Sequence, residues 1–137
     1  MEAEWCDSIE AVVFSGRREG SFYVSIYAKN FRKALGFTPY PGTLNARITR
    51  RDHVDRYVEC LARAKQVRVE PPRIPGARLG GVIVYRSMIM GVDAWIVRPD
   101  ITHYKNDVVE FIAPVYLRKR LNLEDGSKIT FRLALRV

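Results

Sequence analysis

The sequence contains few cysteines and no long hydrophobic stretch. Only two of its 137 residues are cysteines, and Cys6 and Cys60 lie far apart and outside any CxxC pattern. This usage argues against a zinc site and against a disulfide, and it predicts two reduced, partly buried thiols. No apolar run approaches the ~20 residues of a membrane-spanning helix. The N-terminal MEAEWCDSIE is acidic and lacks the basic and apolar regions of a signal peptide, which predicts a cytoplasmic protein.

Acidic residues are outnumbered by basic ones. The chain has 23 Lys and Arg against 15 Asp and Glu, a net charge of +8, and 17 of the basic residues are arginines. The planar guanidinium group suits phosphate, so a nucleic acid, an anionic surface and a polyphosphate ligand are all compatible with this charge. The basic residues are spread along the chain and form no recognisable nucleic-acid motif. Charge alone does not identify the partner.

Short segments with β character dominate the chain. We expect strands at 9–14, 22–26, 44–48, 82–90, 92–97, 108–112 and 129–137, with hairpins joining the first two and the fourth and fifth. The loop 71–81, PPRIPGARLGG, should be exposed. There is no internal repeat or linker, which predicts a single domain over residues 1–137. Short strands joined by hairpins favour a mainly β fold, a small closed barrel rather than an α/β sheet.

Three short helices are expected between these strands. Helical spacing over 27–35 predicts the first, which Gly36 should end. The second should begin at Asp52 as its N-cap and bury a stripe made of Val54, Tyr57, Val58 and Leu61. Pro114 should open the third, which would reach about residue 122.

Two segments carry groups suited to phosphate and metal, and each also has a structural interpretation. In Gly16, Arg17, Arg18, Glu19, Gly20 and Ser21 the glycines would let backbone N–H groups approach an anion. The alternative is a charged hairpin tip, and the segment is not a Walker loop. In PGTLN, Thr43 and Asn45 would point to the same side of an extended chain and offer hard oxygen ligands for Mg²⁺. The alternative is a turn that leads into a strand.

Two further segments could bind a substrate. Glu110 lies inside the apolar segment VVEFIAP. A carboxylate there either holds a hydroxyl group, accepts a proton or pairs with a cation, or it faces solvent. Thr102 and His103 precede it. In Val115–Arg118 the guanidinium group could hold an anionic ligand, or the segment could be a solvated basic helix face. No Ser/His/Asp or Cys/His set supports hydrolase chemistry.

Taken in order, these segments resemble the archaeal CTP-dependent riboflavin kinases. The likeness is carried by Gly16–Ser21 followed by FYVS, by LGFTPYPGTLN (35–45), by RPDITHY (98–104) and by VVEFIAPVYLRKRLNLEDGSKI (108–129). It covers nearly the whole chain, and PYPGTLN and the EFIAP block are its most specific parts. Some relatives carry an N-terminal DNA-binding domain, which this chain is expected to lack.

The resemblance implies a six-stranded β-barrel of the cradle-loop type with two or three short helices. It implies transfer of the γ-phosphate of CTP to the 5′-hydroxyl of riboflavin, which gives FMN and CDP. Nucleotide binding would fall to Gly16, Arg17, Arg18, Glu19, Gly20, Ser21, Val115, Tyr116, Leu117 and Arg118. Thr43 and Asn45 would bind one Mg²⁺, and Thr102 and Glu110 would contact the flavin. Glu110 is the candidate base that orients the hydroxyl.

The chain departs from the family pattern at Arg18, where relatives tend to have glycine, and in the Thr-His-Tyr order of 102–104. We expect a monomer with no membrane or nucleic-acid partner. Two other interpretations stay open. One is a non-enzymatic basic barrel that binds nucleic acid, which the net charge and the LNLEDGSKI ending suggest. The other is a flavin-binding protein without turnover.

Overall fold

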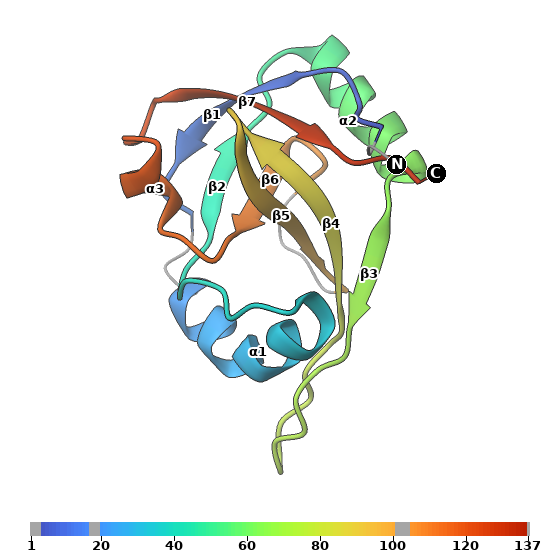
Figure 1. Ribbon diagram of the computed structural model, residues 1–137, viewed down its shortest axis with the longest axis vertical. Helices are drawn as coiled ribbons and strands as arrows, with labels where there is room; N and C mark the ends of the chain where they lie inside the picture. The colour runs from blue at the N-terminus through green and yellow to red at the C-terminus, as the bar shows by residue number, and fades with distance from the viewer. Residues whose placement is uncertain (1–3, 17–19, 101–104, 137) are drawn as a thin grey trace.

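The computed structural model describes residues 4–16, 20–100 and 105–136, and of residues 20–22 only the backbone (Figure 1). Among these residues the strands are β1 (Ile9–Phe14), β2 (Leu44–Arg47), β3 (Gln66–Val69), β4 (Val82–Ile89), β5 (Val92–Pro99), β6 (Val108–Ile112) and β7 (Lys128–Leu133). They form one antiparallel sheet in the order β3-β4-β5-β6-β2-β1-β7. Strand β7 also pairs with β4, which closes six strands into a barrel and leaves β3 attached outside it. The predicted closed barrel is confirmed.

The strand alternation divides the side chains between two hydrophobic clusters. The first cluster fills the barrel and includes Leu44 and Ala46 of β2 and Phe111 of β6. The second lies between the outer face of the sheet and helix α1 (Gly20–Leu35), and Ile112 belongs to it. Neighbouring residues of β6 therefore point to opposite faces, as a strand requires. Strand β7 alternates in the same way between buried and more exposed residues, but it ends at Leu133, short of the predicted 129–137, and Ala134 beyond it is buried.

Helix α1 overturns one prediction. Residues 22–26 were expected to form a strand, but they lie in α1, and β1 pairs with β2 and β7 instead. Val24, Tyr27 and Phe31 recur at helical spacing and are buried in the second cluster, so packing against the barrel overrides the β-propensity of FYVSI. The helix ends at Gly36 as predicted, with φ of +85° and its N–H donated to the carbonyl of Arg32 at 2.8 Å.

The other helices are α2 (Arg51–Arg63) and α3 (Leu117–Arg120), the latter shorter than predicted. Asp52 lies in the first turn of α2 and pairs with Arg50, so its predicted role as the N-cap is wrong. Helix α2 buries His53, Tyr57 and Cys60, whereas Val58 is 43% exposed. Among the described residues no helix is long and apolar enough to cross a membrane. The cytoplasmic location stays a prediction.

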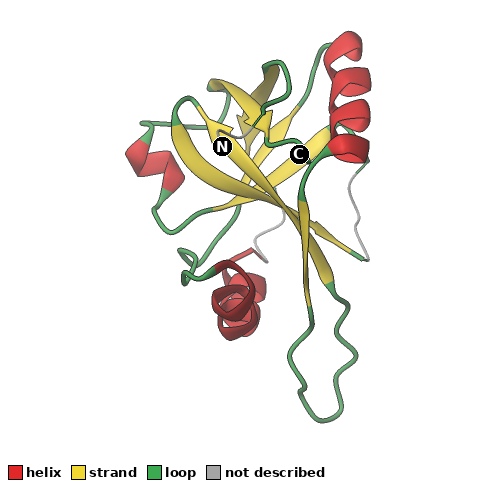
Figure 2. Cartoon of the chain, turned by 45° about the vertical axis from the view of Figure 1, so that its right-hand side comes forward, coloured by secondary structure: helices red, strands yellow, loops and turns green. Residues whose placement is uncertain are grey.

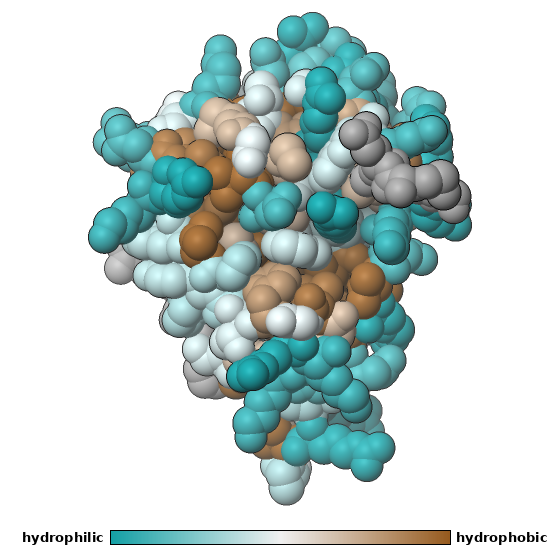
Figure 3. Space-filling view, in the orientation of Figure 1, coloured by the Kyte–Doolittle hydropathy of each residue, from teal (hydrophilic) through white to brown (hydrophobic). Residues whose placement is uncertain are grey.

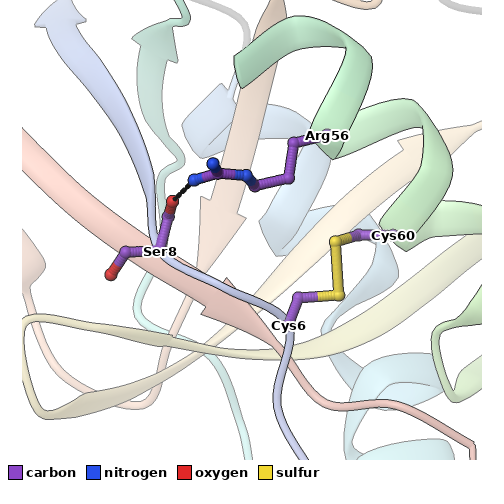
Figure 4. Close-up of a disulfide and its surroundings, with 4 residues drawn as sticks. All are labelled: Cys6, Ser8, Arg56 and Cys60. Atoms are coloured by element: carbon purple, nitrogen blue, oxygen red, sulfur yellow. Dashed lines mark hydrogen bonds between the residues drawn. A yellow bond between two sulfur atoms is a disulfide. The ribbon is translucent and has the colours of Figure 1, made fainter. Parts of the chain in front are cut away.

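Cys6 and Cys60 form a disulfide, so the prediction of reduced thiols is wrong (Figure 4). Their Cα atoms lie 6.3 Å apart and both residues are buried. Nearby, the guanidinium group of Arg56 donates a hydrogen bond to the carbonyl of Ser8, and Nδ1 of His53 accepts one from the N–H of Glu10 at 2.9 Å. These contacts fasten the segment before β1 to α2.

Strand β3, which the sequence analysis missed, pairs with β4 over Val82–Tyr85. The connection between the two strands projects from the barrel (Figure 2). Its residues 73–78 are exposed, which confirms the predicted loop. The projecting end is mostly hydrophilic in Figure 3, although Ile74 is 42% exposed there.

Candidate active site

A pocket of about 250 Å³ opens between the loop that precedes β2 and the segment that joins β6 to α3. Residues 40–44 form one wall, and Phe111, Ala113 and residues 115–118 form the other. The pocket therefore brings Thr43, predicted from PGTLN, together with four of the ten residues predicted to hold the nucleotide, Val115–Arg118.

Tyr40 holds the two walls together. Its N–H donates a hydrogen bond to the carbonyl of Ala113 at 2.8 Å. Its ring stacks on that of Tyr116 with 4.6 Å between centroids and 9° between planes. Both rings are partly exposed, so the rim of the pocket offers a flat aromatic surface. The sequence analysis assigned Tyr40 no role, although it lies within the specific PYPGTLN stretch.

Arg118 connects the pocket to the end of β1. Its guanidinium group donates to Oδ1 of Asp125 at 2.8 Å and to the carbonyl of Phe14 at 3.5 Å. The hydroxyl of Ser15 donates to both oxygens of Asp125 at 2.8 and 3.0 Å. The hydrogen bond from Arg118, followed by that from Ser15, lowers the pKa of Asp125, which therefore stays ionised at neutral pH. Arg118 is thus fixed in orientation by groups that the sequence analysis missed, with the Asp125-Gly126 turn as the only signal.

The same contacts place Ser15 and Gly16, the start of the predicted Gly16–Ser21 segment, beside Arg118. Gly16 directly follows Ser15, and Gly20 and Ser21 begin α1. Arg17, Arg18 and Glu19 lie outside the described residues. The end of β1, which leads into Gly16, therefore lies beside Arg118 of the second predicted nucleotide-binding segment.

Asn45 and Glu110 are direct cross-strand partners on β2 and β6. The flanking pairs, Leu44 with Phe111 and Ala46 with Val109, belong to the barrel interior, so Asn45 and Glu110 share the outward face. Asn45 is 7% exposed, and its Oδ1 has no hydrogen-bond partner among the described residues. Glu110 is half-buried, and burial raises its pKa. The structure therefore brings together two residues predicted from separate motifs.

Glu110 also lines a second, very small pocket with Tyr57, Arg98 and Lys105. Thr102, the other predicted flavin residue, belongs to the connection between β5 and β6 and lies outside the described residues, as do His103 and Tyr104. Two basic side chains that the sequence analysis did not single out, Arg98 and Lys105, thus accompany Glu110 on this side.

The site fits a hard cation held by neutral oxygens. The part of the chain that the structure describes contains no group of three or more His, Cys, Asp or Glu side chains that could hold a metal. A Mg²⁺ ion commonly takes few protein ligands and completes its shell with phosphate and water. The buried, unpaired Oδ1 of Asn45 suits this role, and Thr43 lies two residues before it at the pocket wall. These two residues fit Mg²⁺.

A closed barrel with a loop-walled pocket, an anchored guanidinium group and an adjacent amide–carboxylate pair defines a small-molecule enzyme that acts on an anionic ligand. The family model CTP-dep_RFKase, described as domain of unknown function DUF120, matches residues 13–133. The chain belongs to the CTP-dependent riboflavin kinase family, and it is an enzyme, a kinase.

Individual relatives agree with this assignment. The chain is 56% identical over 129 residues to a riboflavin kinase of Aeropyrum pernix, and the alignment covers 93% of this chain and 96% of that protein. It is 39% identical over 129 residues to a riboflavin kinase of Archaeoglobus fulgidus, covering 93% of this chain and 54% of the relative. For a riboflavin kinase of Pyrobaculum aerophilum the identity is 40% over 127 residues, covering 90% and 59%. The chain thus spans a little over half the length of the last two.

Proposed function

We propose that this chain transfers the γ-phosphoryl group of CTP to the 5′-hydroxyl of riboflavin, with FMN and CDP as products. The relatives named riboflavin kinase support the acceptor, and the family supports CTP as the donor. The observation that carries the proposal is the pocket that joins Thr43 to residues 115–118, with Asn45, two residues after Thr43, paired to Glu110 across β2 and β6. Direct transfer between two substrates requires the donor site and the acceptor-activating carboxylate to be neighbours.

The nucleotide is proposed to occupy the pocket. Arg118 would contribute positive charge to the phosphates, and its bonds to Asp125 and to the end of β1 hold it in place before the ligand arrives. A preorganised charged donor stabilises developing phosphate charge without a cost of reorganisation. Residues Gly16, Gly20 and Ser21, together with Arg17, Arg18 and Glu19, are proposed to complete the phosphate site, and Val115, Tyr116 and Leu117 to hold the nucleoside.

Glu110 is proposed to orient the 5′-hydroxyl of riboflavin and accept its proton, with Thr102 as a second flavin contact. In this reaction the bond from the γ-phosphorus to the bridging oxygen of the β-phosphate breaks. A bond from the γ-phosphorus to O5′ of riboflavin forms, and the hydroxyl proton moves to the carboxylate. Because burial raises the pKa of Glu110, its carboxylate is a stronger proton acceptor than an exposed one.

Thr43 and Asn45 are proposed to hold one Mg²⁺ ion, which would neutralise phosphate charge when bound. Asn45 also fixes the position of β2 opposite Glu110, so the metal site and the proton acceptor share one rigid pair of strands. None of the contacts among the described residues favours the nucleic-acid-binding alternative. The monomeric state stays a prediction.

Incubation of the protein with riboflavin, Mg²⁺ and each of CTP, UTP, ATP and GTP in turn tests the proposal, with FMN quantified by fluorescence after chromatography. We expect FMN with CTP and much less with the purine nucleotides. Equal FMN from all four nucleotides would contradict CTP as the donor, and no FMN from any of them would contradict the reaction. Tight FMN binding in the absence of turnover would identify the flavin-binding alternative.

A further inference from the structure

Tyr23 presents a buried hydroxyl group that the fold leaves unsatisfied. The residue lies in the first turn of α1, and its ring packs between the helix and the barrel with 4.6 Å to the ring of Tyr27. Its hydroxyl oxygen is buried and has no hydrogen-bond partner among the described residues. A buried hydroxyl without a partner destabilises a folded protein. A ligand that accepts a hydrogen bond from this hydroxyl would remove the cost.

Tyr27, one turn further along the same helix, shows the contrasting arrangement. Its hydroxyl donates a hydrogen bond to the carbonyl of Gly80 at 2.7 Å. The two tyrosines share the same helix and the same hydrophobic cluster. Of the two, Tyr23 is nearer the start of α1, where the predicted phosphate-binding segment Gly16–Ser21 ends, and its hydroxyl has no partner among the residues that the structure describes. Packing alone therefore does not account for the hydroxyl of Tyr23.

The groups around Tyr23 indicate what the ligand offers. Glu110 lies on the outward face of β6, and Tyr23 packs against the cluster that contains Ile112 of the same face. Burial first, then Tyr27 and Glu110, raise the pKa of Tyr23, which keeps its proton and remains a donor. Across β2 and β6, Asn45 directly opposes Glu110, and its Oδ1 is likewise buried and unpaired. A phenol donor and a carboxylate acceptor on the same outer side of the barrel match an alcohol, which accepts one hydrogen bond and donates another.

We propose that the Tyr23 hydroxyl donates a hydrogen bond to a hydroxyl group of the ribityl chain of riboflavin, while Glu110 accepts one from that chain. The inference rests on the proposed function and adds a substrate contact from α1 to it. Helix α1 thereby connects the phosphate-binding segment at its start to the acceptor substrate. Without this contact a hydroxyl group of the bound substrate would have no hydrogen-bond partner. In sites built around hydrogen bonds, a missing partner lowers substrate binding strongly.

Tyr23→Phe, with Tyr27→Phe as the matched control, tests the inference. Tyr23→Phe removes an unsatisfied group, so the melting temperature should stay the same or rise, whereas Tyr27→Phe should lower it. We expect Tyr23→Phe to raise both the KM for riboflavin and its dissociation constant, measured by flavin fluorescence, by roughly tenfold. The KM for CTP should be unchanged. Lumiflavin, which has a methyl group in place of the ribityl chain, should bind both Tyr23→Phe and wild type equally well.

The outcomes separate this inference from the function on which it rests. If wild type makes FMN and Tyr23→Phe retains the wild-type KM and affinity for riboflavin, the inference is wrong and the proposed function stands. If Tyr23→Phe weakens the binding of riboflavin and of lumiflavin equally, the contact lies on the flavin ring and the ribityl assignment is wrong. If wild type neither binds riboflavin nor makes FMN, the proposed function fails and the inference fails with it.

Discussion

Removal of the Cys6–Cys60 disulfide should lower the free energy of unfolding substantially. The two cysteines are 54 residues apart in sequence, and the chain-entropy relation for a loop of that length gives about 4 kcal/mol. For a chain of 137 residues this corresponds to a fall in melting temperature of roughly 12 °C. The bridge joins the segment before β1 to α2, so its loss should loosen that end of the barrel first, away from the pocket.

The measurement compares wild type with and without reductant, and both with a Cys6→Ala/Cys60→Ala variant, by thermal and denaturant unfolding. Reduction leaves the side chains in place, so it isolates the crosslink from the packing lost in the alanine variant. We expect both perturbations to shift the midpoint in the same direction and wild type to retain FMN formation at moderate temperature. Identical midpoints with and without reductant, together with two titratable thiols in unreduced denatured protein, would refute the reasoning.

Three further predictions concern the candidate site. Asn45→Ala should raise the Mg²⁺ concentration needed for half-maximal turnover by roughly 10-fold or more while riboflavin binding is retained; a normal Mg²⁺ titration would remove Asn45 from the metal site. Burial raises the pKa of Glu110, so the stability this group contributes is present at low pH and is lost as pH rises through its folded pKa. Glu110→Gln should therefore be at least as stable as wild type at neutral pH, while kcat falls about 100-fold and the acidic limb of the pH–rate profile disappears; a collapse of stability with normal kcat would make Glu110 a structural residue. Asp125→Asn releases Arg118 and should raise the KM for CTP several-fold with little change in stability, because Asp125 is largely exposed. The control Asp107→Asn breaks an exposed 2.9 Å ion pair to Arg47, and an equal rise in KM in that variant would exclude a specific role for Asp125.

The elements that the sequence predicted well are those whose burial pattern is local. Strand β7 alternates strictly, and the β4–β5 hairpin turns at Gly91, which has a φ of +84°. Both signals can be read within a few residues, and both are confirmed. Strand β3 was missed because it is an edge strand of four residues in which only Val69 is buried.

The wrong predictions concern segments whose structure depends on contacts between residues far apart in the sequence. FYVSI has the composition of a strand, yet Val24 is buried by the outer face of the barrel, which a local window does not contain. The disulfide was missed for the same reason, because spacing in sequence does not show that two Cα atoms lie within bridging distance.

The candidate site was predictable in its residues but not in its arrangement. Thr43, Asn45, Glu110 and Arg118 were selected from the motifs, whereas the cross-strand pairing of Asn45 with Glu110 emerges only from the register of β2 and β6. The support that Asp125 gives to Arg118 has only the Asp125-Gly126 turn as a signal in the sequence, and the buried hydroxyl of Tyr23 has none. Contacts between a site residue and the residues that support it depend on how helices and strands pack, so they can be read only from the structure.

The central claim is tested most directly by the products formed from CTP, riboflavin and Mg²⁺ by the wild-type chain. Chromatography with fluorescence and absorbance detection measures FMN and CDP in the same reaction. The proposed transfer predicts that the two accumulate in equal amounts and that neither is formed when riboflavin is omitted. CDP without FMN, or no conversion of riboflavin under any of these conditions, would contradict it.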